Sequence, residues 1–147
     1  MGVALDDYEH KGLFSIAITH FSEEYAALHR NNGGLSFTDV SYPSGIAHAS
    51  TPYVGWGDAF FDLDDGWPDL IIVNGHVYPQ VGTKDIGTKY REPKVLYLNQ
   101  HDGTFRGISK LAGPSIQIPQ VSRGLAVGDC SMMAAWILWS RTWRANP

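Results

Sequence analysis

The sequence contains an internal repeat, and this repeat limits the possible fold more than any other feature. Three short apolar runs each end in aspartate, at residues 4–7, 59–62 and 126–129. A second element, residues 28–45, matches residues 96–113 at a constant distance of 68 positions. The first two apolar runs are only 55 residues apart, so the second copy carries an insertion. We place this insertion in a surface loop near residues 80–93. Repeats of this length are typical of solenoids, propellers and repeat arrays.

Each repeat unit has the pattern of four short strands. The first strand leads into an acidic loop, the second is apolar, the third ends in asparagine, and a glycine turn leads into the fourth. Four-stranded units in series are typical of the blades of a β-propeller. We therefore expect an all-β fold, a partial β-propeller of about two four-stranded blades plus the first strand of a third. The blades would be residues 1–54, 55–121 and 122–129. A helical turn within residues 22–30 is the alternative at one position.

The number of blades predicts that more chain is needed to complete the fold. A propeller usually closes with about four to eight blades, so we expect this sequence to be a fragment of a longer repeat protein. Residues 130–147 contain three tryptophans and no alternation of strand and turn signals. Shifted by one base, the codons of residues 131–136 would encode Asp, Gly and Asp at positions that continue a third acidic loop. We therefore predict that residues 130–147 are an out-of-frame tail.

The second acidic loop is the strongest candidate site. Asp62, Asp64, Asp65 and Asp69 lie within eight residues, and Gly66 supplies a turn between them. Carboxylates packed this closely repel each other, and Ca²⁺ prefers such hard oxygen ligands, so the loop predicts a structural calcium site. The loop is one residue shorter than the usual calcium motif, and a solvated acidic turn without metal is the alternative. We expect the aromatic residues around this loop to pack within the blades: Trp56, Phe60, Phe61 and Trp67.

The other two copies of the loop are degenerate. In the first copy, Asp7 and Glu9 hold the first two ligand positions, but Lys11 and Ser15 replace later carboxylates. We expect weak or absent calcium binding there, with the ammonium group of Lys11 across the carboxylates. The third copy stops after Asp129, its one candidate ligand. The apolar strands that flank the loops exclude an EF-hand, which needs helices on both sides.

Composition argues against several classes of function. The formal charge is −4, whereas nucleic-acid binding needs a basic face, so we expect no nucleic-acid partner. No apolar segment is long enough to span a bilayer, and no signal peptide is visible in this chain. Nucleophile-elbow, Walker A and dinucleotide-binding motifs are absent, so we expect the chain not to be an enzyme. His76, which also fits a packed turn, and Arg123 are the candidates for the alternative of an enzymatic site.

Several strings of the sequence resemble one family. They are MGVALDDYEHKG, NNGGLSFTDVSYPSGIA, GWGDAFFDLDDGWPDLIIVNGHVYPQV, VLYLNQHDGTF and SRGLAVGD. Together they resemble the FG-GAP/VCBS repeat proteins, and most closely the ASPIC/UnbV type related to cartilage acidic protein. The resemblance implies a propeller of about seven blades, calcium in the loops between strands, and an extracellular, periplasmic or cell-surface location for the full-length protein.

The resemblance also implies a role in binding or surface interaction. The partner would be a protein or a carbohydrate, and neither is identified by the residues. An incomplete propeller also exposes sheet edges, so we expect self-association through the exposed blade edges. Two alternatives remain at this point: a truncated, frameshifted product without independent function, and part of a propeller enzyme whose site lies elsewhere.

Overall fold

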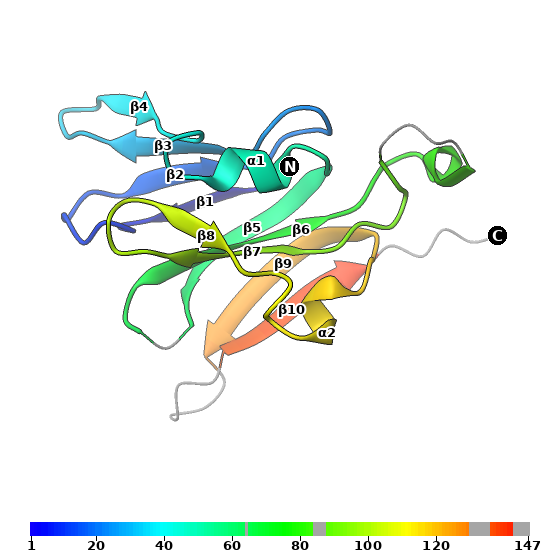
Figure 1. Ribbon diagram of the computed structural model, residues 1–147. Coiled ribbons are helices and arrows are strands. Elements are labelled where there is room, and N and C mark those ends of the chain that lie inside the picture. Colours follow the sequence, from blue (N-terminus) through cyan, green and yellow to red (C-terminus); the bar gives the residue numbers. More distant parts are fainter. Residues whose placement is uncertain (64, 84–87, 130–135, 143–147) are drawn as a thin grey trace.

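The computed structural model describes residues 1–63, 65–83, 88–129 and 136–142, and these residues form mostly β structure (Figure 1). The first antiparallel sheet contains β1 (Val3–Asp6), β2 (Ser15–Ile18), β3 (Ala27–Asn31) and β4 (Phe37–Asp39). The second contains β5 (Gly55–Asp62), β6 (Pro68–Asn74), β7 (Val95–Asn99) and β8 (Phe105–Gly107). The third pairs β9 (Ser122–Asp129) with β10 (Trp136–Thr142). The expected all-β class is confirmed, and within the described residues the sheets do not close into a ring.

The sequence repeat is also a repeat of hydrogen bonds. In the first sheet, the backbone N–H of Leu28 donates to the hydroxyl of Ser41; in the second, Leu96 donates to Ser109. These pairs lie 68 positions apart in the sequence, the same distance as the matched segments. The chain therefore leaves the fourth strand of each sheet through an equivalent hydrogen bond, as the repeat predicts.

Short helices follow the fourth strands and were not expected from the sequence. Helix α1 (Ile46–Ser50) follows Gly45, and α2 (Pro114–Gln117) follows Gly113, at the same distance of 68 positions. Both glycines have a φ near +85°, a conformation that L side chains rarely adopt. A third short helix, η1 (Pro79–Thr83), lies in the insertion. The alternative of a helical turn within residues 22–30 is wrong, because the backbone turns there and enters β3.

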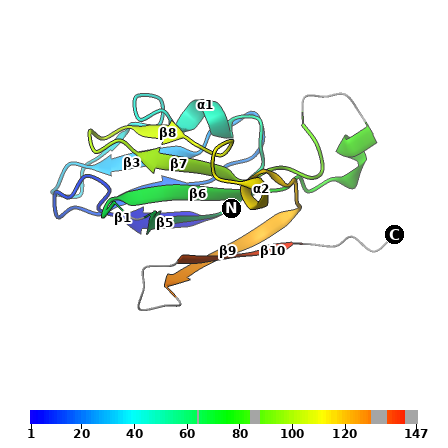
Figure 2. The same cartoon turned by 60° about the horizontal axis from the view of Figure 1, so that its bottom comes forward.

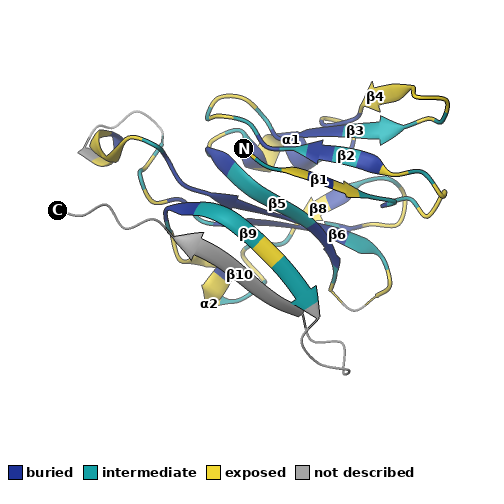
Figure 3. Cartoon of the chain, turned by 180° about the vertical axis from the view of Figure 1, so that it is seen from behind, coloured by how far each residue is buried: buried dark blue, intermediate teal, exposed yellow. Residues whose placement is uncertain are grey.

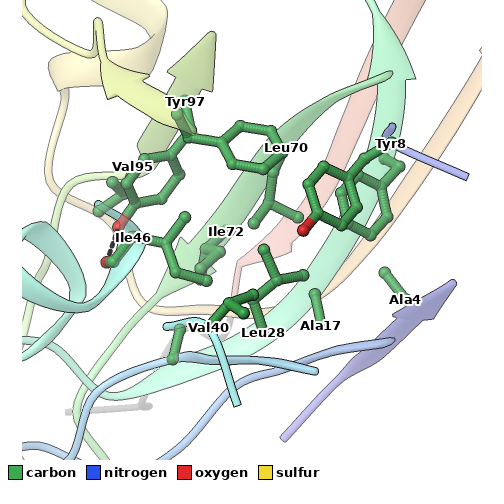
Figure 4. Packing of buried hydrophobic residues seen from close by; sticks show 13 residues of the cluster. Ala4, Tyr8, Ala17, Leu28, Val40, Ile46, Leu70, Ile72, Val95 and Tyr97 are labelled. Carbon is green, nitrogen blue, oxygen red and sulfur yellow. Dashed lines mark hydrogen bonds between the residues drawn. The ribbon is translucent and has the colours of Figure 1, made fainter. Parts of the chain in front are cut away.

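The three sheets follow one another in chain order, and the second sheet lies between the other two (Figures 1 and 2). One face of the second sheet, bearing Phe60, Leu70 and Ile72, packs against Ala4, Ala17 and Leu28 of the first (Figure 4). The hydroxyl of Tyr97 donates to the carbonyl of Ile46 at 2.7 Å across this contact. The opposite face packs against the third sheet through one apolar cluster: Phe61, Ile71, Leu96, Ile116, Leu125 and Val127.

The first strands of the three sheets, β1, β5 and β9, lie side by side (Figure 3). Glycine is required at their points of contact. A Cβ on Gly2 would collide with the Asp58 side chain, and a Cβ on Gly57 would lie 2.7 Å from Cβ of Leu125. The two contacts are equivalent, because Gly57 is 55 positions after Gly2 and Leu125 is 67 positions after Asp58. Neighbouring sheets are therefore joined by a contact that repeats along the chain.

The described parts of the tail and of the insertion contain regular structure that the sequence does not indicate. Residues 136–142 form β10 and pair antiparallel with β9, although the sequence shows no strand signal there. The reading-frame hypothesis stays a prediction, because a strand says nothing about the frame. The end of the insertion is internal: Glu92 is buried, forms a bridge with Gln120, and accepts a hydrogen bond from the backbone N–H of Val54. No helix in the described part of the chain is long and apolar enough to cross a membrane.

We predict that Gly57→Ala lowers the free energy of unfolding by about 1–3 kcal/mol, since the new methyl group has no space beside Leu125. The matched control is Gly107→Ala in β8, where a Cβ meets nothing within 4 Å. The control should change stability by less than about 0.5 kcal/mol. Urea unfolding measures both variants, and equal effects would contradict the close approach of β5 and β9.

Asp58 is an unusual residue at this contact. The equivalent positions in β1 and β9 hold the apolar residues Val3 and Leu125, yet Asp58 places a carboxylate between two strands. Both of its oxygens are buried and make no hydrogen bond of ordinary geometry within the described residues. Burial raises the pKa of Asp58 from 3.8 to about 7. The charged form of Asp58 is therefore disfavoured in the folded chain.

We predict that Asp58→Asn reduces the dependence of stability on pH. A carboxyl whose pKa is raised by folding stabilises the fold below its unfolded pKa, near 3.8, and this contribution is lost as pH rises through about 7. Asp58→Asn should therefore be more stable than the parent chain at pH 8 and unfold with a flatter pH profile from pH 4 to 7. A slope remains, because burial also raises the pKa of Glu92 to about 7. Thermal unfolding across this range tests the prediction, and an unchanged profile would contradict it.

Candidate metal centre

The acidic loop connects β5 to β6 and forms a tight turn. Asp62 ends β5 and pairs with Pro68 at the start of β6, so the strand register brings the two ends of the loop together. Gly66 has a φ of 82°, which explains why glycine stands at the tip. Asp62 accepts hydrogen bonds from the backbone N–H groups of Asp65 and Gly66. The loop is thus ordered by its own backbone around the first carboxylate.

Three carboxylates converge at this turn. Asp62, Asp65 and Asp69 each offer one oxygen, and these oxygens all lie within 4.8 Å of one another. Asp65 is exposed, whereas Asp69 is fully buried in β6. Burial raises the pKa of Asp69, and the negative charges of Asp65 and Asp62 raise it further, against two hydrogen bonds that lower it. The arrangement is one that a cation would stabilise by neutralising adjacent charges.

Asp69 connects the loop to β7. Its Oδ1 accepts a 2.7 Å hydrogen bond from the backbone N–H of Asn99, and its Oδ2 accepts one from Leu63 at 3.0 Å. The buried amide of Asn99 in turn donates to the carbonyls of Tyr8 and Pro68. The candidate centre is therefore fixed by contacts from the first acidic loop, β6 and β7.

An aromatic stack lies beside the acidic loop. The Trp67 ring lies between the imidazoles of His10 and His101, with centroids 4.1 Å and 4.6 Å away. His101 also places Nε2 at 3.0 Å from an oxygen of Asp65. Trp67 therefore does not pack within a blade, contrary to the expectation. Its ring instead connects three loops at one end of the molecule. The expectation for Phe60 and Phe61 is confirmed, since both belong to buried apolar clusters.

The remaining predicted ligands have different surroundings. Asp64 lies outside the described residues, as does the side chain of Asp129. Asp7 accepts hydrogen bonds from the backbone N–H groups of Lys11 and Gly12, the counterpart of the bonds to Asp62. The carboxylate of Glu9 pairs with the ammonium of Lys11 at 2.8 Å. In the described part of the chain, only the second loop brings three possible ligands together.

His76 and Arg123 occupy structural positions. His76 is buried in a turn, where its Nδ1 accepts a hydrogen bond from the backbone N–H of Tyr78, and burial lowers its pKa. Arg123 donates to the carbonyls of Gly75 and His76 and lies over the ring of Trp56, 4.6 Å from its centroid. Both side chains hold the turn after β6, which agrees with the interpretation of His76 as a packed turn residue.

No family model matches the chain, and no curated protein matches it. The resemblance to FG-GAP/VCBS repeat proteins therefore depends on the strings in the sequence.

Sequence reasoning missed Asn99 and His101 as parts of the centre. His101 lies 36 positions after Asp65, and no local pattern connects them. The internal repeat carries a signal for Asn99, because Asn31 ends the third strand of the first unit as Asn99 ends that of the second. An asparagine at both strand ends indicates a common structural role, which the hydrogen bonds identify.

We predict that Asn99→Ala lowers the free energy of unfolding by roughly 1–3 kcal/mol, because it leaves the buried carbonyl of Tyr8 and the half-buried carbonyl of Pro68 without their donor. Asn31→Ala is the matched control. Asn31 occupies the same place in the first sheet but is only half-buried, so its replacement should cost less. Chemical denaturation of the two variants measures the difference, and a control that costs as much would show that burial of Asn99 is unimportant.

Proposed function

We propose that the chain is part of a β-propeller of the FG-GAP/VCBS type, with a binding role and a structural calcium ion in the acidic loop of its second unit. The observation that carries the proposal is the repeated contact between sheets. The second sheet packs on the first, and the third on the second, through equivalent strands and equivalent glycines. Sheets added by one repeated operation are typical of propeller blades.

Calcium is the cation that fits the loop best. Ca²⁺ accepts about six to eight oxygen ligands in flexible geometry, from carboxylates, backbone carbonyls and water. Asp62, Asp65 and Asp69 would supply the charged ligands, with Asp64 a further candidate from sequence. Bound there, Ca²⁺ would stabilise the β5–β6 hairpin by removing repulsion between carboxylates, and its effect would reach β7 through Asn99. The ion has a structural role in this proposal, and no chemical step is assigned to it.

The binding role has an unidentified protein or carbohydrate partner, and the full-length protein would work outside the cytosol or at the cell surface. This part of the proposal is supported by the sequence resemblance. We assign no enzymatic activity to the two candidates for a site: Nδ1 of His76 and the guanidinium NH groups of Arg123 form hydrogen bonds with the backbone of a turn.

A frameshifted product without independent function is the second candidate, and the codon pattern of residues 131–136 favours it. The gene sequence tests it. If the shifted frame continues beyond this point with further acidic loops and strand patterns, residues 130–147 are out of frame. An early stop codon in that frame would refute this candidate and leave the calcium proposal unaffected.

We predict that Ca²⁺ stabilises the intact chain through the second loop. A ligand at about 100 times its dissociation constant adds about 2.7 kcal/mol to the free energy of unfolding. Asp62→Asn should remove most of this gain, whereas Asp7→Asn, at the equivalent position of the first loop, should retain it. Thermal unfolding with and without Ca²⁺, and calorimetric titration, measure the effect. No binding heat and no shift in unfolding of the parent chain would refute the calcium site.

A further inference from the structure

A cavity of about 600 Å³ lies where the first repeat unit meets the second. One wall comes from α1 and the turn after it, and the other comes from the start of β7, the end of β8 and α2. Helix α1 lies beside β7 and β8 at this point (Figure 2). Both walls belong to adjacent units of this chain, so further units that stack on the first or the third sheet would leave these walls together.

The size and the lining of this cavity fit a small-molecule site. Such sites have volumes of about 300–1,000 Å³ and mostly apolar walls with a few polar groups. Val95 and Ile108 contribute to the apolar part of the wall. The ionisable side chains of the lining include the basic residues His48, Lys94 and Lys110, and the described lining holds no aspartate or glutamate. Basic groups are therefore concentrated here, although the whole chain has a formal charge of −4.

Lys94 is the buried member of this basic set. It is 6% exposed, whereas His48 and Lys110 are exposed. Its ammonium donates to the carbonyl of Ser115 and to the side-chain oxygen of Gln120, both at 3.1 Å. These acceptors are neutral, and no carboxylate of the described residues forms an ion pair with Lys94. An ammonium has three N–H donors, so one of them is left for a ligand.

The repeat indicates that the fold does not require this charge. Lys94 directly precedes the third strand of its sheet, and the equivalent residue 68 positions earlier is Ala26, which is 5% exposed. Burial lowers the pKa of Lys94, because the ammonium is removed from water without a carboxylate beside it. An anion in the cavity would offset the cost of burying this charge.

We propose that the cavity binds a small organic anion, a molecule with an apolar body and one oxyanion group that pairs with Lys94. The apolar body would lie against Val95 and Ile108, and the oxyanion would accept the remaining N–H of the ammonium. Hydrogen bonds of this kind, between two charged groups, are about twice as strong as those between neutral groups. The site shares no lining residue with the acidic loop, so it does not depend on calcium.

Fluorescence titration of the intact chain with anilinonaphthalene sulfonate tests the proposal, because this dye joins an apolar aromatic body to one sulfonate. Phenylnaphthylamine has the same aromatic body without the charge. Lys94→Met should weaken binding of the anionic dye by at least about tenfold and of the neutral dye by less than about twofold, since only the anion loses a charged partner. Lys89→Met is the matched control: it removes the same charge from an exposed lysine outside the lining, and it should bind both dyes as the parent does.

Filling the cavity is a second test, which leaves Lys94 and its hydrogen bonds in place. Ala49→Trp adds a large side chain at an exposed position of the wall, so both dyes should bind at least about tenfold more weakly. Leu35→Trp, at a turn residue that is 95% exposed and outside the lining, is the control and should change neither affinity. Circular dichroism confirms that each variant is folded. The proposal is overturned if the parent shows no saturable binding of the anionic dye, if folded Lys94→Met binds it as the parent does, or if Ala49→Trp does.

Discussion

The burial of β6 on both faces is the constraint on which the rest of the structure depends. Its residues Leu70, Ile71, Ile72 and Val73 are all at most 1% exposed, although successive side chains of a strand point in opposite directions. Each fully buried aliphatic side chain contributes about 1.5–3 kcal/mol to the free energy of unfolding. On a sheet covered on one side only, half of these side chains would be exposed and would lose this contribution. The second sheet therefore needs the first and the third, and stacked sheets follow from this strand.

The same strand fixes the acidic loop. Asp69 directly precedes Leu70, so the packing of Leu70 against the first sheet holds the carboxylate in place. The repulsion between the carboxylates is offset in part by backbone N–H donors from Leu63 and Asn99. The three oxygens are consequently close together before any cation binds, and little rearrangement of the backbone would be needed to accept one.

Local patterns in the sequence predicted local structure well. The apolar run after the acidic loop is β6, and the asparagine-ended segments are β3 and β7. Two kinds of feature were not predictable. The short helices α1 and α2 depend on glycines whose conformation is set by the path of the chain after the fourth strand. The contacts of His101 with Asp65 and of Asn99 with Tyr8 join residues 36 and 91 positions apart, which periodicity does not report.

Comparison of the two acidic loops separates the hydrogen bond made at one loop position from the charge that this position carries. Ser15 and Asp69 are equivalent, since each accepts the backbone N–H of the asparagine that ends the third strand, Asn31 or Asn99. A neutral hydroxyl is therefore sufficient for this hydrogen bond. In the first loop the charge at this position is absent, and Lys11 neutralises Glu9. In the second loop a buried carboxylate stays beside two others, at an electrostatic cost that the turn does not require. A bound cation would offset this cost, which is the physical reason for proposing a metal in the second loop and not in the first.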